Sequence, residues 1–330
     1  MCIKKIKNYD ELARNDLRKE ALSIVESGLQ AIDTKRAIER FVKITDGEIS
    51  VIGQKFNLDK KGRIFVIGVG KCSLDSAEVL EKLYGDYIYK GMVIDIRCNT
   101  ELKKIKSCEG DHPFPSQRNV DLTSEMIEML KEVTKDDLVL AIISGGGSTL
   151  LCNPVNFTCV DESNIIQCLF RGGANIQEIN MIRKHLSLAR GGNLAKACYP
   201  AQVAVLIFSD VIENDLNSIA SGPFIKDNSL VDEARETLKK YDIDKRCSFD
   251  ATNLMETPKE DKYFEKVQNF ILVSNETAIN MMKKKVIELG LEPIILSTEL
   301  YDEVSVSLER IFKNNKNNSV VLAGGEPMLE

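Results

Sequence analysis

One candidate for phosphate binding is the sequence VIGVGK at residues 66–71, where an apolar segment ends in glycines and a lysine. Gly68 and Gly70 would let a phosphate approach the backbone, a helix starting here would offer N–H donors, and Lys71 adds a positive charge. The segment does not match the P-loop, which needs glycine at position 65 and Ser or Thr at position 72. The dinucleotide-binding pattern fails at Ser73. A tight strand-to-helix turn with a solvated lysine explains the pattern about equally well.

Three consecutive glycines form the second candidate. Gly145, Gly146 and Gly147 stand between Ser144 and Ser148, at the end of the apolar run 137–144. In open α/β sheets, ligands bind at the carboxyl ends of strands. Ordering a glycine costs roughly 0.5–1 kcal/mol relative to alanine, so an ordinary turn has little reason to contain three. The pattern therefore favours an anion-binding loop over a simple turn.

A carboxylate follows another apolar run, at residues 202–209. Asp210 could hold Mg²⁺ or accept a hydroxyl proton, although capping the next turn is the commoner role of such an aspartate. Asn214 and the short Ser221-Gly222 turn place further polar groups soon after it.

Cations and histidines complete the set of candidates. Arg183 and Lys184 precede His185 in a helical pattern, and His112 lies in the motif DHPFP at residues 111–115. These are the chain's two histidines, so their position in motif-like segments is of interest. A solvated charge cluster and structural histidines are the ordinary alternatives.

The elements that must position these residues follow a repeated order of apolar strand, glycine turn and helix. Continuous Val/Ile/Leu runs predict strands at 63–69, 91–96, 137–144 and 202–209, each covered on both faces as in a parallel sheet. Helices are expected at 71–83 and 116–133, in two N-terminal segments between 10 and 41 that break near 33–34, and over 160–197. A second series has strands at 269–274, 292–297 and 319–323 and helices at 276–289 and 301–312.

This order predicts an α/β protein with a doubly wound, Rossmann-like three-layer domain. We expect that domain, with a helical insertion, at residues 1–245, a linker at 246–264, and the start of a second, incomplete α/β domain at 265–330.

Composition excludes several classes of partner. The chain has 330 residues and a net charge of −6, without a basic block, which argues against nucleic acid. The N-terminal sequence lacks the apolar core of a signal peptide and no apolar run is long enough to span a membrane, so we expect a cytoplasmic protein. Nine scattered cysteines without a C-x-x-C pair are expected to be buried, unpaired residues in a reducing compartment.

Seven motifs in this order resemble the class II glycerate 2-kinase family, whose C-terminal part is named MOFRL and which was formerly described as hydroxypyruvate reductase. They are GVGK at 68–71, DHPFP at 111–115, ISGGGS at 143–148, INMIRKHLS at 179–187, SDVIEND at 209–215, IASGP at 219–223 and AGGE at 323–326.

The resemblance implies transfer of the γ-phosphoryl group of ATP to the 2-hydroxyl of D-glycerate, with Mg²⁺, in a cleft between two α/β domains. Lys71 matches the family's catalytic lysine, and the glycine loop and the segment after Asp210 are expected in the cleft. We expect Lys71 and Asp210 to be catalytic, Asp210 to bind the metal, and Arg183, Lys184 and His112 to bind the acceptor. The residues expected to bind ATP are Gly68, Gly70, Ser144, Gly145, Gly146, Gly147, Ser148, Asn214, Ser221, Gly222 and Glu326.

Members of the family continue after G-G-E with a G-G-R-N segment that bears a functional arginine, whereas this sequence stops at Glu330. The resemblance therefore implies a chain that lacks the C-terminal end. We expect the protein to be a monomer or homodimer. Two other functions remain open: reduction of hydroxypyruvate with NAD(P)H, and nucleotide binding without turnover.

Overall fold

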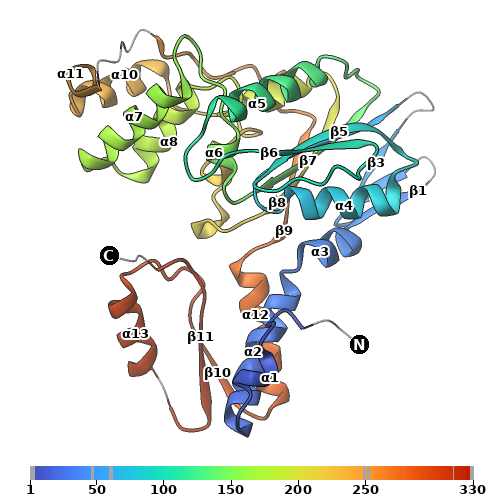
Figure 1. Ribbon diagram of the computed structural model, residues 1–330, viewed down its shortest axis with the longest axis vertical. Helices are drawn as coiled ribbons and strands as arrows, with labels where there is room; N and C mark the ends of the chain where they lie inside the picture. The colour runs from blue at the N-terminus through green and yellow to red at the C-terminus, as the bar shows by residue number, and fades with distance from the viewer. Residues whose placement is uncertain are drawn as a thin grey trace. The chain divides into compact units, whose positions relative to one another are not determined.

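The computed structural model describes residues 4–45, 48–58, 62–247, 250, 253–314 and 316–327 (Figure 1). Two compact units divide the chain. The larger comprises residues 41–211 and 215–272, and the smaller comprises 1–40, 212–214 and 273–330. These units do not coincide with the domains expected at 1–245 and 265–330, because the N-terminal helices belong to the smaller unit. Of the expected linker, residues 248, 249, 251 and 252 lie outside the described residues.

A six-stranded sheet forms the centre of the larger unit, in the order β6-β5-β4-β7-β8-β9. Its strands are β4 (Ile64–Val69), β5 (Ile88–Asp95), β6 (Ile105–Glu109), β7 (Leu138–Ser144), β8 (Gln202–Phe208) and β9 (Val267–Val273). The pairs β6-β5, β5-β4, β4-β7 and β7-β8 are all parallel. The predicted α/β fold is confirmed. The assignment of β9 to a second domain was wrong, because this strand completes the first sheet.

Helices cover both faces of this sheet. Helix α4 (Ser73–Tyr84) lies on the face that contains Gly68, since a Cβ at Gly68 would meet Ser73 at 3.2 Å. Alternate strand residues such as Phe65, Ile67 and Val69 pack on the other face with α5 (Gln117–Leu130) and α9 (Asn193–Cys198). Figure 1 shows α4 and α5 on opposite sides of the strands. Because both faces are apolar and covered, β4 and β7 are buried along their whole length.

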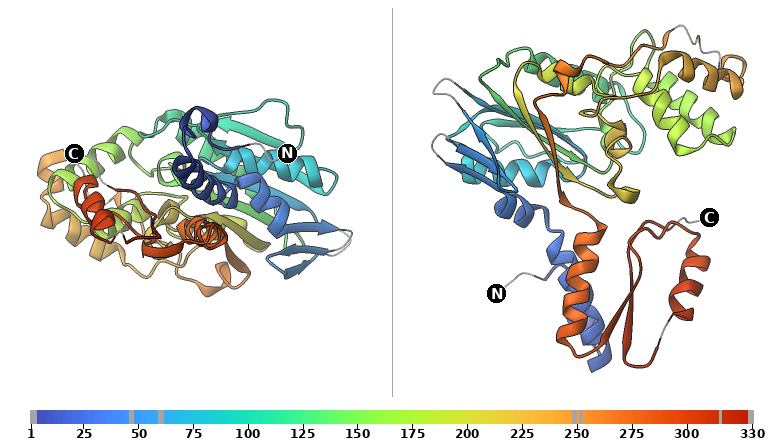
Figure 2. Two further views of the ribbon diagram at one scale, coloured as in Figure 1. Left: turned by 90° about the horizontal axis from the view of Figure 1, so that it is seen from below. Right: turned by 180° about the vertical axis from the view of Figure 1, so that it is seen from behind.

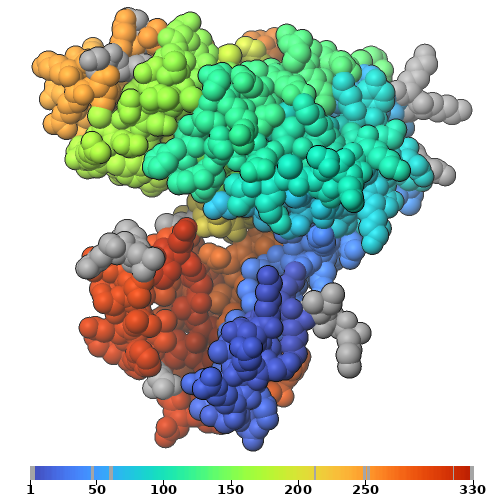
Figure 3. Space-filling view, viewed as in Figure 1, coloured from blue at the N-terminus to red at the C-terminus, as the bar shows by residue number. Residues whose placement is uncertain are grey.

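Helices from two parts of the chain form a separate layer beside the sheet, drawn in yellow-green and orange in Figure 3. The predicted helical stretch at 160–197 supplies α7 (Cys159–Arg171) and α8 (Ile176–His185), and a later segment supplies α10 (Val231–Lys240) and α11 (Ile243–Cys247). The end of the predicted stretch forms α9, which packs on the sheet instead. Apolar residues on these helices form a core of their own. A disulfide joins Cys168 on α7 to Cys247 on α11, so the expectation that the cysteines are unpaired was wrong for these two. Cys2 lies outside the described residues.

The smaller unit is built around two helices that pack along each other. Helix α2 (Asp16–Ala31) contacts α12 (Asn275–Glu288), and the right-hand view of Figure 2 shows them side by side. A Cβ at Gly28 would lie 2.8 Å from Met282 Cγ, so glycine permits this close approach. The core of the unit contains Ile24, Ile279, Val286 and Leu322.

The rest of the chain comprises short elements. The smaller unit includes α1 (Tyr9–Leu12), the parallel pair β10 (Glu292–Ser297) and β11 (Ser319–Ala323), and α13 (Val304–Lys313). Helix α3 (Thr34–Phe41) precedes an antiparallel sheet of β1 (Val42–Thr45), β2 (Glu48–Val51) and β3 (Gln54–Asn57), which the sequence reading missed. No helix in the described residues has the length and apolarity needed to cross a membrane.

Candidate active site

The backbone N–H groups at the start of α4 are already hydrogen-bonded. Lys71 N–H donates to the Gly145 carbonyl (3.0 Å), Cys72 N–H to Ser144 Oγ (3.0 Å) and Ser73 N–H to the Gly70 carbonyl (3.0 Å). The next N–H, that of Leu74, donates to the Asp95 carboxylate at 3.0 Å. The expectation that this helix start offers its amides to a phosphate was therefore wrong.

Gly68 and Gly70 instead allow close packing. Gly70 has φ +115°, and a Cβ there would lie 2.2 Å from Ser144 Oγ and 2.5 Å from the Ser144 carbonyl oxygen. A side chain at Gly68 would press on Val93, Ile142 and α4. These glycines bring the ends of β4 and β7 together, so that Lys71 emerges directly beside the triple-glycine loop.

Lys71 and His112 meet over the glycine loop. Gly146 has φ +82°, and a Cβ there would lie 3.2 Å from Lys71 Cε and 3.3 Å from His112 Cδ2. Two residues that are far apart in the sequence therefore share the surface above one glycine. Desolvation and the positive charge of Lys71 lower the pKa of His112 below its usual value. The imidazole is thus neutral at pH 7.

The same loop has amides available for a ligand. Among the hydrogen bonds of the described residues, none uses the N–H groups of Gly146, Gly147 or Ser148. Asp210 lies against the start of the loop, since a Cβ at Gly145 would be 2.0 Å from Asp210 Oδ2. The loop therefore presents N–H donors close to Lys71, with a carboxylate against its first glycine.

Ser148 connects the loop to a second polar turn. Its Oγ lies 3.1 Å from the Oγ of Ser221, which is in the 3₁₀ turn η2 (Ile219–Ser221) and also donates to Asn180 Oδ1 (3.5 Å). Gly222 follows with φ +62° and ends this turn. Gly147 allows the contact, because a Cβ there would meet Ala220 Cβ at 2.7 Å.

A cavity of about 220 Å³ opens beside Ser148 and Thr149. Arg183 lines it, and no hydrogen bond or ion pair within the described residues engages this guanidinium. Burial and repulsion by Arg190 lower the pKa of Arg183 to about 10, so the group is still charged at pH 7. The remaining lining is mixed, from Pro113, Phe114, Pro115, Glu162, Ser163, Ile166, Gln167 and Phe170.

Sequence reasoning missed a buried ion pair under this cavity. Arg190 and Glu162 are 0% and 3% exposed, and Arg190 Nη1 donates to Glu162 Oε1 at 2.7 Å. Its Nη2 donates to the Ser148 carbonyl at 2.6 Å. In the sequence, Arg190 precedes two glycines and Glu162 lies in an ordinary helical segment, so nothing there connects them.

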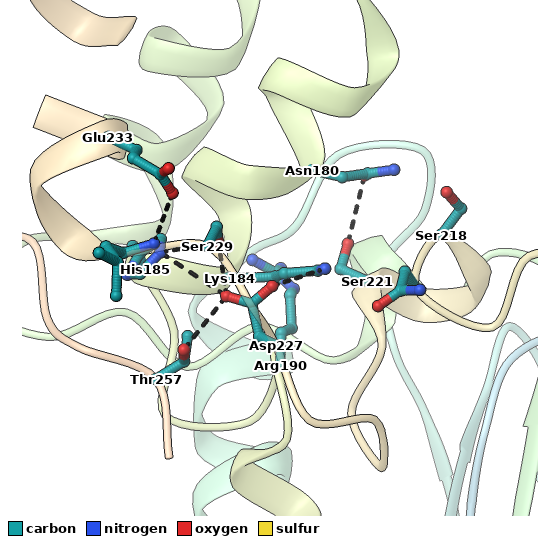
Figure 4. A network of polar contacts seen from close by, with 12 residues as sticks. Asn180, Lys184, His185, Arg190, Ser218, Ser221, Asp227, Ser229, Glu233 and Thr257 are labelled. Atoms are coloured by element: carbon teal, nitrogen blue, oxygen red, sulfur yellow. Dashed lines mark hydrogen bonds and ion pairs between the residues drawn. The ribbon is translucent and has the colours of Figure 1, made fainter. Parts of the chain in front are cut away.

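Lys184 and His185 point into a different network (Figure 4). Lys184 is buried and its Nζ lies 3.1 Å from Asp227 Oδ1, while Asp227 also accepts from Ser229. His185 is held by the Met255 carbonyl (2.7 Å) and Ser229 Oγ (3.1 Å). This network ties α8 to the segments around 227 and 256. Lys184 was expected beside Arg183 at the acceptor, but it does not line the cavity.

Two other candidates belong to the smaller unit. Asn214 has φ +52° in the short turn η1 (Ile212–Asn214), and Glu326 is exposed after β11. Their participation in the site stays a prediction. Pro327 is described, but residues 328–330 lie outside the described part of the chain.

Comparison with known proteins points to one family. Residues 20–256 match a family model described as "Domain of unknown function (DUF4147)". The chain is 32% identical to the glycerate 2-kinase of Pyrococcus horikoshii over 299 residues, which cover 87% of this chain and 66% of the relative. It is 30% identical to the D-glycerate 2-kinase of Thermotoga maritima over 326 residues, covering 95% of this chain and 74% of the relative. The chain thus spans about two thirds to three quarters of these relatives.

The structure agrees with these sequence comparisons. A crystal structure of glycerate kinase from Thermotoga maritima superposes with a TM-score of 0.78 at 28% identity, covering 95% of this chain and 75% of that one. The family model matches well over half of the chain, and the motifs at the glycine loop lie within the matched residues. The chain therefore belongs to the glycerate 2-kinase family.

Proposed function

We propose that this chain phosphorylates D-glycerate at its 2-hydroxyl, with ATP as the phosphoryl donor and 2-phosphoglycerate as the product. The observation that supports this most directly is the convergence of Lys71 and His112 on Gly146, in a loop whose N–H groups are available. Phosphoryl transfer depends mainly on positioning and on neutralising charge, and this loop supplies both kinds of group.

Each group has a distinct role in this proposal. Lys71 neutralises oxygens of the transferring phosphoryl group, while the amides of Gly146, Gly147 and Ser148 donate to them. His112 is neutral, so one ring nitrogen can accept a hydrogen bond from the acceptor hydroxyl. Asp210 is the alternative proton acceptor at the same loop.

Arg183 is the cation best suited to the acceptor's carboxylate. It lines the cavity beside Ser148 and has no partner within the described residues, whereas Lys184 is paired with Asp227. A guanidinium also matches a carboxylate geometrically, with two parallel N–H donors. We therefore assign the acceptor carboxylate to Arg183 rather than Lys184.

Mg²⁺, which the family resemblance implies, fits the donor chemistry at Asp210. In kinase sites this ion is usually held by one or two carboxylates together with substrate phosphates and water. The described residues contain no group of three His, Cys, Asp or Glu side chains that could hold a metal. In this proposal, substrate phosphates and water therefore supply most of the ligands. Asp210 would bind the ion, which when bound neutralises phosphate charge.

The carboxylate at the end of β5 gives little support to the hydroxypyruvate reductase alternative. In dinucleotide-binding sheets an acidic residue at the end of this strand hydrogen-bonds the ribose. Here Asp95 is fully buried, and its Oδ2 accepts the Leu74 N–H at the start of α4. Burial raises the pKa of Asp95. This carboxylate is therefore committed to the helix and is not exposed to a ribose.

A pair of assays tests the proposal. ADP release is measured with D-glycerate, ATP and Mg²⁺, and NADPH oxidation is measured with hydroxypyruvate. We expect the first reaction and not the second. ATP binding by calorimetry without ADP release would instead support the nucleotide-binding alternative, and NADPH oxidation would support the reductase.

A further inference from the structure

The charges that line the acceptor cavity and lie directly under it do not balance. Two guanidinium groups, Arg183 and Arg190, lie near one carboxylate, Glu162. Glu162 Oε1 accepts from Arg190, and its Oε2 accepts from the Cys152 thiol at 3.5 Å. Glu162 lines the same cavity as Arg183, yet the described ion pairs include none between these two side chains. The result is a neutralised pair beside an uncompensated guanidinium.

Arg190 is the cation that pairs with Glu162. It reaches Glu162 with Nη1 and the Ser148 carbonyl with Nη2, so its fork is fixed between α7 and the glycine loop. A buried carboxylate that lost this partner would carry a large desolvation penalty. Arg183, unlike Arg190, lines the cavity together with Glu162, and the Glu162 charge already acts on it.

We infer that Arg190 is a positioning residue that occupies Glu162 and thereby reserves Arg183 for the carboxylate of the acceptor. This inference rests on the proposed function, because it names how the proposed acceptor site is kept open to a small carboxylate. Without Arg190, Glu162 turns to Arg183, and the incoming anion must compete with a carboxylate that belongs to the protein. A second effect follows from Ser148, whose carbonyl loses a charged donor when Arg190 is removed.

The test is a double-mutant cycle of Arg190→Met and Glu162→Gln, with KM for D-glycerate, KM for ATP and kcat measured by ADP release. We expect R190M to raise the acceptor KM about 10- to 100-fold, the range for loss of a charged hydrogen bond. E162Q alone should leave this KM unchanged or lower it, because it removes the competing carboxylate. The double variant should return the acceptor KM to within about threefold of wild type.

The kinetic constants distinguish an effect of Arg190 on the glycine loop from its effect on the acceptor site. Any loss caused by the Ser148 carbonyl appears in kcat or in the ATP KM, and E162Q does not restore it. A merely structural ion pair predicts that both single variants weaken the enzyme similarly and that the double variant is no better than R190M. That pattern, or an unchanged acceptor KM in R190M, would overturn the inference. If R190M does not fold, the test rests on E162Q, because a raised acceptor KM in this variant would contradict the inference about Arg190.

Arg63→Met is the matched control. Arg63 donates to the buried Asp137 carboxylate (2.8 Å) and to the Glu132 carbonyl (2.7 Å), the same bonding pattern at the opposite end of β4. This variant should be less stable than wild type with an unchanged acceptor KM.

Calorimetric titration with D-glycerate, without turnover, keeps the two hypotheses distinguishable. Turnover by wild type with no change in R190M affinity overturns only the role of Arg190. Glycerate binding that R190M weakens and E162Q restores, without ADP release, supports the role of Arg190 and contradicts the kinase proposal. Absence of glycerate binding to wild type overturns both.

Discussion

Replacing Gly146 with alanine tests whether the loop surface is the place where Lys71 and His112 act together. The added methyl group would lie 3.2 Å from Lys71 Cε and 3.3–3.4 Å from the His112 ring. These separations are shorter than ordinary van der Waals contact, so both side chains must move by a few tenths of an ångström or more. Because Lys71 is the proposed neutralising charge, such a displacement reaches the chemical step directly.

Two contributions determine the size of the effect. Alanine at φ +82° costs about 1–2 kcal/mol of backbone strain, which lowers the free energy of unfolding. Misplacing a catalytic group by about 1 Å can cost about 100-fold in rate, so smaller shifts of two groups predict a kcat lower by about 10- to 100-fold. We expect the free energy of unfolding to fall by about 1–2 kcal/mol and kcat to fall by about 10- to 100-fold.

Gly53→Ala provides the matched control. Gly53 has the same φ of +82°, but a Cβ there would have no neighbour within 4 Å among the described residues. It lies in the turn between β2 and β3. Urea unfolding of both variants should show similar losses of stability, whereas ADP release should fall only for G146A. Equal kcat values in the two variants would show that the loop surface is not where phosphoryl transfer takes place.

The same geometry makes four further predictions. Lys71→Met should collapse kcat; near-normal turnover would eliminate the assigned role, and a change confined to KM would make Lys71 a ground-state anchor. The chain has two histidines, and NMR titration can follow both. Each should have a pKa below its usual value. In K71M the pKa of His112 should rise because the Lys71 charge is gone, whereas that of His185 should stay low because burial lowers it. In the kinase assay, the decrease of kcat/KM on the acidic side should begin only below pH ~6.5, because the pKa of His112 is lowered and the imidazole is neutral above it. A decrease that begins above pH ~6.5 would contradict a neutral His112. Arg183→Met should raise the acceptor KM, whereas Lys184→Met should mainly lower the free energy of unfolding, because the buried Asp227 carboxylate loses its nearest cation. Equal effects of the two variants on the acceptor KM would contradict the distinction.

Local sequence patterns were sufficient for most strands of the parallel sheet. Continuous apolar runs predicted β4, β5, β7 and β8 because buried parallel strands need apolar residues on both faces. The short antiparallel strands β1–β3 were missed because each offers only four residues. The position of β9 could not be predicted, since a strand's own residues do not specify which sheet edge it joins.

The sequence alone determined that Lys71 follows β4 and that the glycine loop follows β7, because each apolar run and the glycines after it are contiguous in the chain. Only the tertiary structure decided which groups there remain available. The amides at the start of α4 donate to the Gly70 and Gly145 carbonyls, the Ser144 hydroxyl and the Asp95 carboxylate. Within the described part of the chain, no hydrogen bond uses the amides of Gly146 and Gly147. Likewise, Arg183 and Lys184 are adjacent in sequence, yet one lines a cavity and the other pairs with Asp227. The physical reason is that desolvation and pairing of a polar group depend on residues brought from distant parts of the chain.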